Sequence, residues 1–248
     1  LHSFPTRRSS DLSLTKEEIR RLLWRYPYEA STQIAQKITV SELKQAGQPA
    51  TKKYADFAAE EENNILPMRR GLIVHYLMET IDLEMLKKTN RYEEIIKEYL
   101  NRLIAEKIIS KQEAQAIETD KLAKFWTSEA GQIILQAERV QREVEFYYRA
   151  NAKEVYKNMC VDSGEHVYIQ GIIDCVATYQ GVDYIIDYKT DYYRPENRKE
   201  RIAPYRTQLR YYQKAYEAIT KTRNTIGILC FINMGENIIM GTAGDADE

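Results

Sequence analysis

Two aspartates and a lysine near the middle of the chain have the spacing of a hydrolytic site. Asp174 and Asp187 lie in two runs of β-forming residues, 169–179 and 182–190, which are separated by a Gln-Gly turn candidate. A two- or four-residue loop centred on that dipeptide places the two aspartates directly opposite each other. Lys189 follows Asp187 by two residues and therefore lies on the same face of its strand. Two carboxylates and an ammonium group on one face of a hairpin favour a metal-dependent hydrolytic site.

Hairpin geometry alone leaves a structural alternative open. Asp187 and Lys189 could form an ordinary surface ion pair, and a loop of odd length would turn Asp174 to the opposite face. Like charges directly opposite each other destabilise a strand pair, so such a pair needs a compensating cation. Ile172-Ile173 and Ile185-Ile186 make both strands apolar on both faces near the acids. Such strands are usually buried, and a buried unpaired carboxylate is costly, which favours the functional interpretation.

The two acidic segments belong to a wider pattern. G-I-I-D at residues 171–174 is followed by D-Y-K-T-D at residues 187–191. This combination resembles the RecB-type nucleases, a branch of the PD-(D/E)XK fold. The resemblance is closer still to the C-terminal nuclease region of the AddA family, which are subunits of bacterial ATP-dependent helicase/nucleases. It extends over most of the chain, from W-R-Y-P-Y at residues 24–28 to F-I-N-M-G at residues 231–235.

The periodicity of residues 69–88 predicts a helix that carries another motif. Leu72, His75, Tyr76 and Glu79 share one face by their i, i+3, i+4 and i+7 spacing. A lone histidine on a half-apolar helix is usually a core or surface residue. However, R-G-x-x-x-H-x-x-x-(E/Q) is the first RecB-nuclease motif, so the resemblance implies that His75 binds metal. Leu72 replaces the small hydroxyl residue usual in the family, and we expect it to loosen the start of the helix.

The resemblance implies one set of metal ligands. Its members are His75, Asp174, Asp187 and the backbone carbonyl of Tyr188, whose ring is expected to point into the core. Hard oxygen ligands select Mg²⁺, and a site that also offers an imidazole tolerates Mn²⁺. Lys189 is expected to orient or deprotonate the attacking water and to neutralise developing charge, and the sequence leaves open which.

A further acidic residue lies on the strand predicted for residues 140–149. The segment R-E-V-E-F resembles the family's R-E-x-P-F, with Glu145 in place of the usual proline. Glu143 either lies near the site and orients a ligand or water, or is a charged residue on an exposed strand face. The sequence favours neither interpretation.

Basic residues are concentrated downstream of the hairpin. A basic loop predicted at residues 192–204 holds Arg194 and Arg198, and Arg206 follows at the start of a helix predicted over residues 205–220. Local positive charge beside candidate metal ligands suits a phosphate backbone, although charge runs are usually only solvated faces.

The helix predicted over residues 205–220 carries one more family motif. Its Q-L-R-Y-Y segment fits the Q-x-x-x-Y motif that closes the RecB-type site. The resemblance implies that Gln208 and Tyr212 contact DNA or hold the lysine and water. The other tyrosines of this helix, Tyr205, Tyr211 and Tyr216, are expected to pack.

Composition excludes several classes of protein. The apolar fraction of 44% and the charged fraction of 29% are typical of a globular domain, and a formal net charge of −1 offers no global attraction to nucleic acid. Cys160, Cys175 and Cys230 are widely spaced without C-x-x-C, which indicates a reducing, cytoplasmic location. That spacing also argues against a zinc ribbon and against the iron–sulfur cluster that some relatives carry. No P-loop motif occurs, so this chain is not expected to hydrolyse ATP.

We expect an α/β fold, with a restriction-endonuclease-like mixed central sheet that contains the hairpin, flanked by helices and preceded by a helical N-terminal cover. Helical patterns also occupy residues 14–25, 92–106, 110–126 and 128–138, and the last strands are expected at 225–233 and 237–240. The expected divisions are a foreign or disordered leader at 1–12, a connecting segment at 13–65, a RecB-like nuclease domain at 66–242 and a polar tail at 243–248.

The resemblance implies a function. We expect a Mg²⁺-dependent exonuclease that hydrolyses phosphodiester bonds of single-stranded DNA. It would be part of a helicase/nuclease that processes double-strand breaks for recombinational repair, with the helicase portion of a parent chain and the second protein of the helicase/nuclease as partners. Two alternatives remain: a free-standing RecB-like exonuclease, and a catalytically inactive nucleic-acid-binding scaffold module.

Overall fold

The hairpin predicted from the sequence forms the middle of the sheet. The computed structural model describes residues 15–24, 35–43, 67–156 and 164–241. β3 (His166–Tyr179) and β4 (Val182–Lys189) are antiparallel neighbours joined by Gln180 and Gly181, whose φ angles are 51° and 74°. Positive φ at both central residues is the geometry of a two-residue type I′ turn, whose twist matches that of the flanking strands. The pairs next to the turn lie in the register predicted for a loop centred on this dipeptide.

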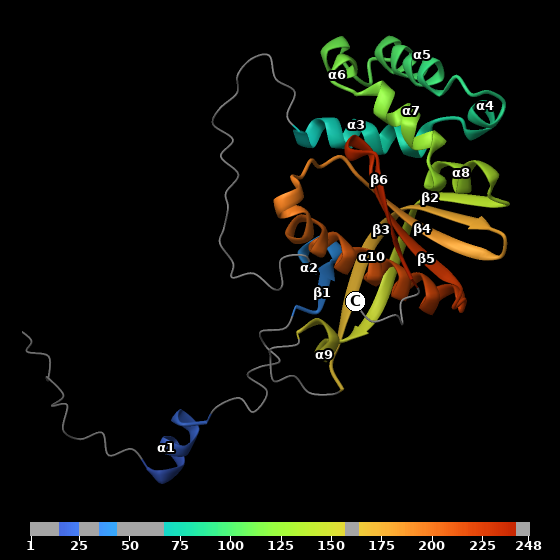
Figure 1. Cartoon of the computed structure of the whole chain (residues 1–248). Helices are drawn as coiled ribbons and strands as arrows, with labels where there is room; N and C mark the ends of the chain where they lie inside the picture. The colour runs from blue at the N-terminus through green and yellow to red at the C-terminus, as the bar shows by residue number, and fades with distance from the viewer. Residues whose placement is uncertain (1–14, 25–34, 44–66, 157–163, 242–248) are drawn as a thin grey trace, which may run out of the picture.

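Four further strands in the described part of the chain complete a mixed sheet around the hairpin (Figure 1). They are β1 (Lys37–Thr39), β2 (Arg139–Asn151), β5 (Thr225–Phe231) and β6 (Glu236–Met240). β2 runs antiparallel along one edge of β3, β5 is parallel to β4, and β6 is antiparallel to β5. β1 pairs in parallel with the start of β3, on the edge that β4 occupies farther along. Residues 171–174 of β3 therefore have no strand beside them on that edge among the described residues.

Helices cover both faces of the sheet, as expected for the α/β class (Figure 1). The helical layer on one face consists of α3 (Pro67–Thr80), α4 (Leu83–Lys87), α5 (Tyr92–Ala105), α6 (Lys111–Gln115), α7 (Thr119–Thr127) and α8 (Glu129–Gln136). The opposite face is covered by α10 (Arg198–Thr220) and α2 (Val40–Leu43). The remaining helical segments are α1 (Lys16–Leu22), α9 (Ala152–Val155), η2 (Pro195–Asn197) and η3 (Ile232–Met234). No helix among the described residues has the length and apolar character needed to cross a membrane.

The regular alternation of the sheet is interrupted at Glu143 and Asp174. Residues two apart on a strand normally share a face, yet Ile173 packs with α10 and Cys175 packs with the helical layer. Glu143 and Asp174 are left out of the β2–β3 pairing, which continues in the same register on either side of them. Glu143 also has a φ of 51°, which is uncommon for a residue other than glycine. Two acidic side chains therefore lie where the strand geometry is broken.

The single helix predicted over residues 69–88 is wrong, because the segment forms two helices. α3 ends at Thr80 and α4 begins at Leu83. Asp82 separates them, and its side chain accepts a hydrogen bond from the backbone N–H of Glu84 at 2.8 Å. An aspartate favours this N-cap position over a helix interior because its carboxylate satisfies free N–H groups.

Two other predicted boundaries also differ. The helix predicted over residues 110–126 is divided into α6 and α7, because Ile117 turns into the core of the helical layer between them. α10 begins at Arg198, so part of the predicted loop at residues 192–204 is helical and includes Pro204. Burial of Ile202 against the sheet draws this first part of the helix onto the core.

Gly171 should tolerate no side chain. A Cβ atom there would lie 2.8 Å from ring carbons of Phe146 and 2.9 Å from Val40 Cγ2. We expect Gly171→Ala to lower the free energy of unfolding by about 1–3 kcal/mol, since overpacking strains both neighbours. Urea denaturation measures the change.

Gly164→Ala is the matched control, because a Cβ atom there would meet nothing within 4 Å. It should leave stability unchanged or raise it by about 0.4–1 kcal/mol. Equal unfolding midpoints for the two variants would contradict the close packing described at Gly171.

Candidate active site and metal centre

Three potential metal ligands meet at the interruption in the sheet. His75 projects from α3, Glu143 from β2 and Asp174 from β3, and one ligand atom of each lies within 4.8 Å of the others. The Nδ1 atom of His75 lies 3.5 Å from Oδ1 of Asp174. All three residues are partly buried. An imidazole and two carboxylates in this arrangement suit a divalent cation that accepts oxygen and nitrogen ligands.

The charges of this cluster shift the pKa values of its members. Burial alone would lower the pKa of His75, but its hydrogen bond and attraction to Asp174 raise the pKa above the ordinary value. Burial alone would raise the pKa of Asp174, but His75 and Lys189 hold it below the ordinary value. Burial and the nearby charges of Asp174 and Glu79 raise the pKa of Glu143. The cluster therefore holds more negative charge than its own cations offset, and a bound cation fits that deficit.

Asp187 lies beside this cluster but takes a different partner. Its side chain is 1% exposed, and the Nζ atom of Lys189 lies 2.6 Å from its Oδ2 atom. Asp187 is not a member of the group formed by His75, Glu143 and Asp174. The β3–β4 pairing ends one residue before the aspartates, and Asp174 Oδ2 instead accepts a hydrogen bond from the backbone N–H of Tyr188 at 2.7 Å.

Lys189 is held on its other side by α10. Its Nζ atom lies 5.0 Å from the centre of the Tyr205 ring, a cation–π contact. The hydroxyl of Tyr205 donates a hydrogen bond to Asp191 at 2.8 Å. Burial and the neighbouring charge of Asp191 raise the pKa of Tyr205, which keeps it a neutral donor. Tyr205 is therefore more than a packing residue, and Asp191, the last residue of the D-Y-K-T-D segment, fixes its position.

Gln208 and Tyr212 are both buried beneath the site. The amide Nε2 of Gln208 donates to the hydroxyl of Tyr212 at 2.5 Å, and the ring of Tyr212 meets that of Phe146 edge-on at 5.6 Å. Burial, with a further contribution from Asp187, raises the pKa of Tyr212. The two motif residues thus pack against the underside of the site rather than project into solvent.

The ring of Tyr188 lies in the core, where the sequence places it. It is buried in the helical-layer cluster and meets the rings of Phe125 and His75 at 5.6 Å and 6.3 Å. Burial raises its pKa well above the ordinary value. The Tyr188 ring therefore supports the face of α3 that carries the histidine.

The candidate phosphate-binding arginines lie in different environments. Arg194 is exposed and Arg206 is half-buried. Arg198 forms an ion pair with Glu236, which also accepts a hydrogen bond from Tyr193. Of these arginines, Arg194 is thus the one whose side chain extends into solvent.

Arg142 is a structural residue of the site that sequence reasoning missed. Its guanidinium donates to the backbone carbonyls of Ile81 at 2.8 Å and Met78 at 3.3 Å, at the C-terminal end of α3. Helix C-termini attract cations because their last carbonyls lack partners. Arg142 precedes Glu143 on β2, so it ties the helix that carries His75 to the strand that carries Glu143. Its place directly before Glu143 in the R-E segment was the available signal.

Curated proteins with similar sequences share one description, as a subunit of an "ATP-dependent helicase/nuclease". The chain is 35% identical over 219 residues to the protein of this description from Clostridium kluyveri, covering 82% of this chain and 17% of that protein. Those from Syntrophomonas wolfei and Geobacillus kaustophilus are 31% and 33% identical, covering 90% and 82% of this chain. The chain spans less than a fifth of the length of these relatives, with 19% and 18% of the latter two covered.

Structural and family comparisons differ in what they establish. A structure titled "Crystal structure of SSO0001" aligns with 86% of this chain and 72% of its own, at 13% identity and a TM-score of 0.35, too low to bear on the fold. The model of the PD-(D/E)XK nuclease superfamily matches residues 19–236, which include every residue of the site described above. The chain therefore belongs to the PD-(D/E)XK nuclease superfamily.

Proposed function

We propose that this chain is the metal-dependent nuclease part of a helicase/nuclease and hydrolyses phosphodiester bonds of single-stranded DNA as an exonuclease. The observation that carries the proposal is the meeting of His75, Glu143 and Asp174 beside the Asp187–Lys189 pair. Metal ligands on one side and a buried ammonium group on the other are the parts that phosphodiester hydrolysis needs.

We infer that His75, Asp174 and Glu143 hold a divalent cation, with Asp187 and the Tyr188 carbonyl completing its surroundings. Two carboxylates favour Mg²⁺, and the imidazole allows Mn²⁺ to substitute. When bound, such a cation supplies positive charge at the scissile phosphate and makes a water molecule easier to deprotonate. Glu143, left undecided by its sequence, is supported as a ligand by its place in the cluster.

The residues of the chain divide the remaining work. Asp187 and the Tyr205 ring hold the Lys189 ammonium group from two sides, which orients it toward a water molecule or a phosphate oxygen. An ammonium group there would neutralise charge that develops on the phosphate during attack. Gln208 and Tyr212 would keep α10 at a fixed distance beneath the lysine, since their side chains bond to each other in the interior.

The substrate and partners are proposed from the relatives. Their description as parts of an ATP-dependent helicase/nuclease supports a DNA substrate that is delivered by unwinding. The helicase part of a longer chain and a second, different protein chain are the partners that such an assembly requires. Processing of double-strand breaks for recombinational repair is the role that we propose for the assembly.

Removing either member of the Asp187–Lys189 pair should abolish most nuclease activity. We expect Asp187→Asn and Lys189→Gln each to lower kcat by roughly 10²–10⁴-fold, the contribution typical of a positioned proton-transfer or charge-stabilising group. Digestion of 5′-labelled single-stranded DNA with Mg²⁺ measures the loss.

Asp120→Asn and Lys124→Gln are matched controls, because these residues form an exposed ion pair on α7 at 3.9 Å. Both should digest DNA at the parent rate. Digestion by the Asp187 and Lys189 variants at that same rate would exclude the proposed site, and no digestion by the parent chain would favour an inactive binding module.

Glu143 should contribute directly to metal affinity. We expect Glu143→Gln to weaken Mn²⁺ binding by at least the roughly 10–100-fold that is typical even of changes to outer-shell partners. Isothermal titration calorimetry of the DNA-free protein measures the dissociation constant. Glu145→Gln, two residues along the same strand and exposed, should leave it unchanged. Equal Mn²⁺ affinities for the two variants would remove Glu143 from the ligand set.

Tyr205 should act on Lys189 through its ring. Tyr205→Leu removes a cation–π contact worth about 0.5–2 kcal/mol, so we expect kcat to fall by roughly 2–30-fold. Tyr205→Phe keeps the ring and should retain more of the activity than Tyr205→Leu. Single-turnover digestion separates this effect from product release, and equal rates for the two variants would show that the ring does not support the lysine.

A further inference from the structure

One face of the β2–β3 ribbon is bare next to the active site. Before the interruption, alternate residues of both strands pack with α10, and the residues between them point to the other side. Members of β2 and β3 that contact the helical layer all lie beyond the interruption, at the turn end of the ribbon. In Figure 1 the two strands continue past the helical layer toward α9. The side of the sheet that the helical layer covers at one end is therefore exposed at the other.

Large side chains lie exposed on this bare face. Tyr147, Tyr168 and Ile172 are 63%, 52% and 44% exposed. Tyr147 pairs across the ladder with Gln170, and Tyr168 with Arg149, so the two tyrosines are diagonal neighbours on one face. Diagonal neighbours lie roughly 7–8 Å apart, within reach of each other's rings.

We propose that this bare face binds single-stranded DNA and leads it to the metal centre, with Tyr147 and Tyr168 as stacking surfaces for successive bases. The inference rests on the proposed nuclease function and adds a substrate-binding surface to it. Exposed aromatic rings on a sheet bind unpaired bases without regard to sequence, because every base has a flat π face. Duplex DNA keeps its bases stacked inside and cannot use such rings.

The charges of the face suit a phosphate backbone. The Nζ atom of Lys37, on β1, lies 5.5 Å from the centre of the Tyr147 ring. Arg149, opposite Tyr168, is exposed beside the ring. Glu145 is the one acidic residue in the described segments 144–151 and 166–173. Rings flanked by cations favour a polyanion with aromatic bases over an apolar protein surface.

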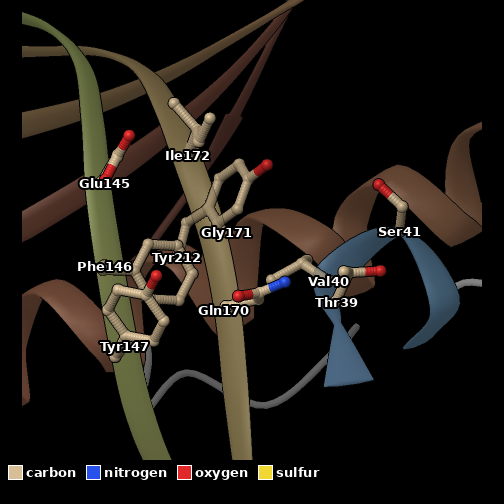
Figure 2. Close-up of a pocket in the computed structure, with 10 residues that line it drawn as sticks. All are labelled: Thr39, Val40, Ser41, Glu145, Phe146, Tyr147, Gln170, Gly171, Ile172 and Tyr212. Atoms are coloured by element: carbon tan, nitrogen blue, oxygen red, sulfur yellow. The ribbon is translucent and has the colours of Figure 1, made fainter. Parts of the chain in front are cut away.

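The position of the face connects it to the chemistry. Ile172 lies two residues before Asp174, and Tyr168 lies six residues before it, or about 20 Å at the rise of a β-strand. A cavity of about 390 Å³ opens along this stretch where β3 lacks a partner strand, between Gly171 and the β1–α2 segment. Figure 2 shows Tyr147 on one side of β3 and Thr39 on the other, both lining this cavity. A strand lying across the rings would therefore pass the cavity and reach Asp174.

Binding can be measured separately from cleavage. Fluorescence anisotropy of a labelled oligo-dT in EDTA reports affinity without hydrolysis. We expect the double variant Tyr147→Leu/Tyr168→Leu to lose roughly fivefold or more in affinity for each ring removed. The double variant Tyr147→Phe/Tyr168→Phe keeps both rings and should bind within about twofold of the parent. Tyr179→Leu, at the turn end of β3, is the matched control and should also bind like the parent.

Two further measurements distinguish this surface from the catalytic site. The Leu double variant should hydrolyse bis(p-nitrophenyl) phosphate with Mn²⁺ at the parent rate, because so small a diester needs only the metal centre. Lys37→Gln/Arg149→Gln should lower the slope of log affinity against log salt by about 1.4, the value for two lost phosphate contacts to a single strand.

The outcomes separate this inference from the proposed function. Unchanged oligo-dT affinity in the Leu double variant overturns the stacking surface and leaves the face for a protein partner, while nuclease activity stands. Failure of the parent to hydrolyse either DNA or the small diester overturns the proposed function instead. Weaker DNA binding by the Leu variant with unchanged hydrolysis of the small diester supports the stacking surface.

Discussion

Repulsion between carboxylates in a confined site is the constraint on which the rest of this structure depends. Glu143 and Asp174 lie close enough to share a ligand sphere, and Asp187 is buried beside them. Two like charges 4 Å apart repel by about 4 kcal/mol at the effective dielectric constant of a protein surface. His75 and Lys189 offset part of that charge, each through one carboxylate. The remainder explains why Glu143 binds its proton more tightly than usual, and why the site accepts a cation.

Such a site needs strong support from the parts around it. Arg142 ties the end of α3 to β2, and Gly71 lets the start of the same helix approach Thr190, where a Cβ atom would lie 3.2 Å from the threonine hydroxyl. Asp191 and Tyr205 fix the lysine from the other layer. The positive φ of Glu143 is an uncommon backbone state of the kind that a well-supported functional site retains. Both helical layers are thus needed to hold one small cluster of charges.

Sequence reasoning predicted the hairpin and its register because a Gln-Gly turn and period-two alternation are local signals. It placed His75 and Asp174 in one site through motifs, and the geometry brings these two residues together. Glu143 could not be decided, because its direction depends on an interruption of the β2–β3 ladder that no local pattern reveals. Tyr205 was assigned to packing for a similar reason, since its contact with Lys189 depends on where α10 crosses the sheet. The helix break at Asp82 could have been predicted from its N-cap character alone.

The interruption also explains why the acids divide into two sets. Had the β3–β4 ladder continued, Asp174 and Asp187 would face each other with one charge directly opposed to the other. The ladder stops at Cys175 instead, and the Asp174 carboxylate turns to the N–H of Tyr188. That turn leaves Asp187 to the lysine and gives Asp174 to the histidine and Glu143. One lost strand pair thus separates a group that holds a cation from a group that holds an ammonium ion. The two groups remain in contact through a single backbone hydrogen bond.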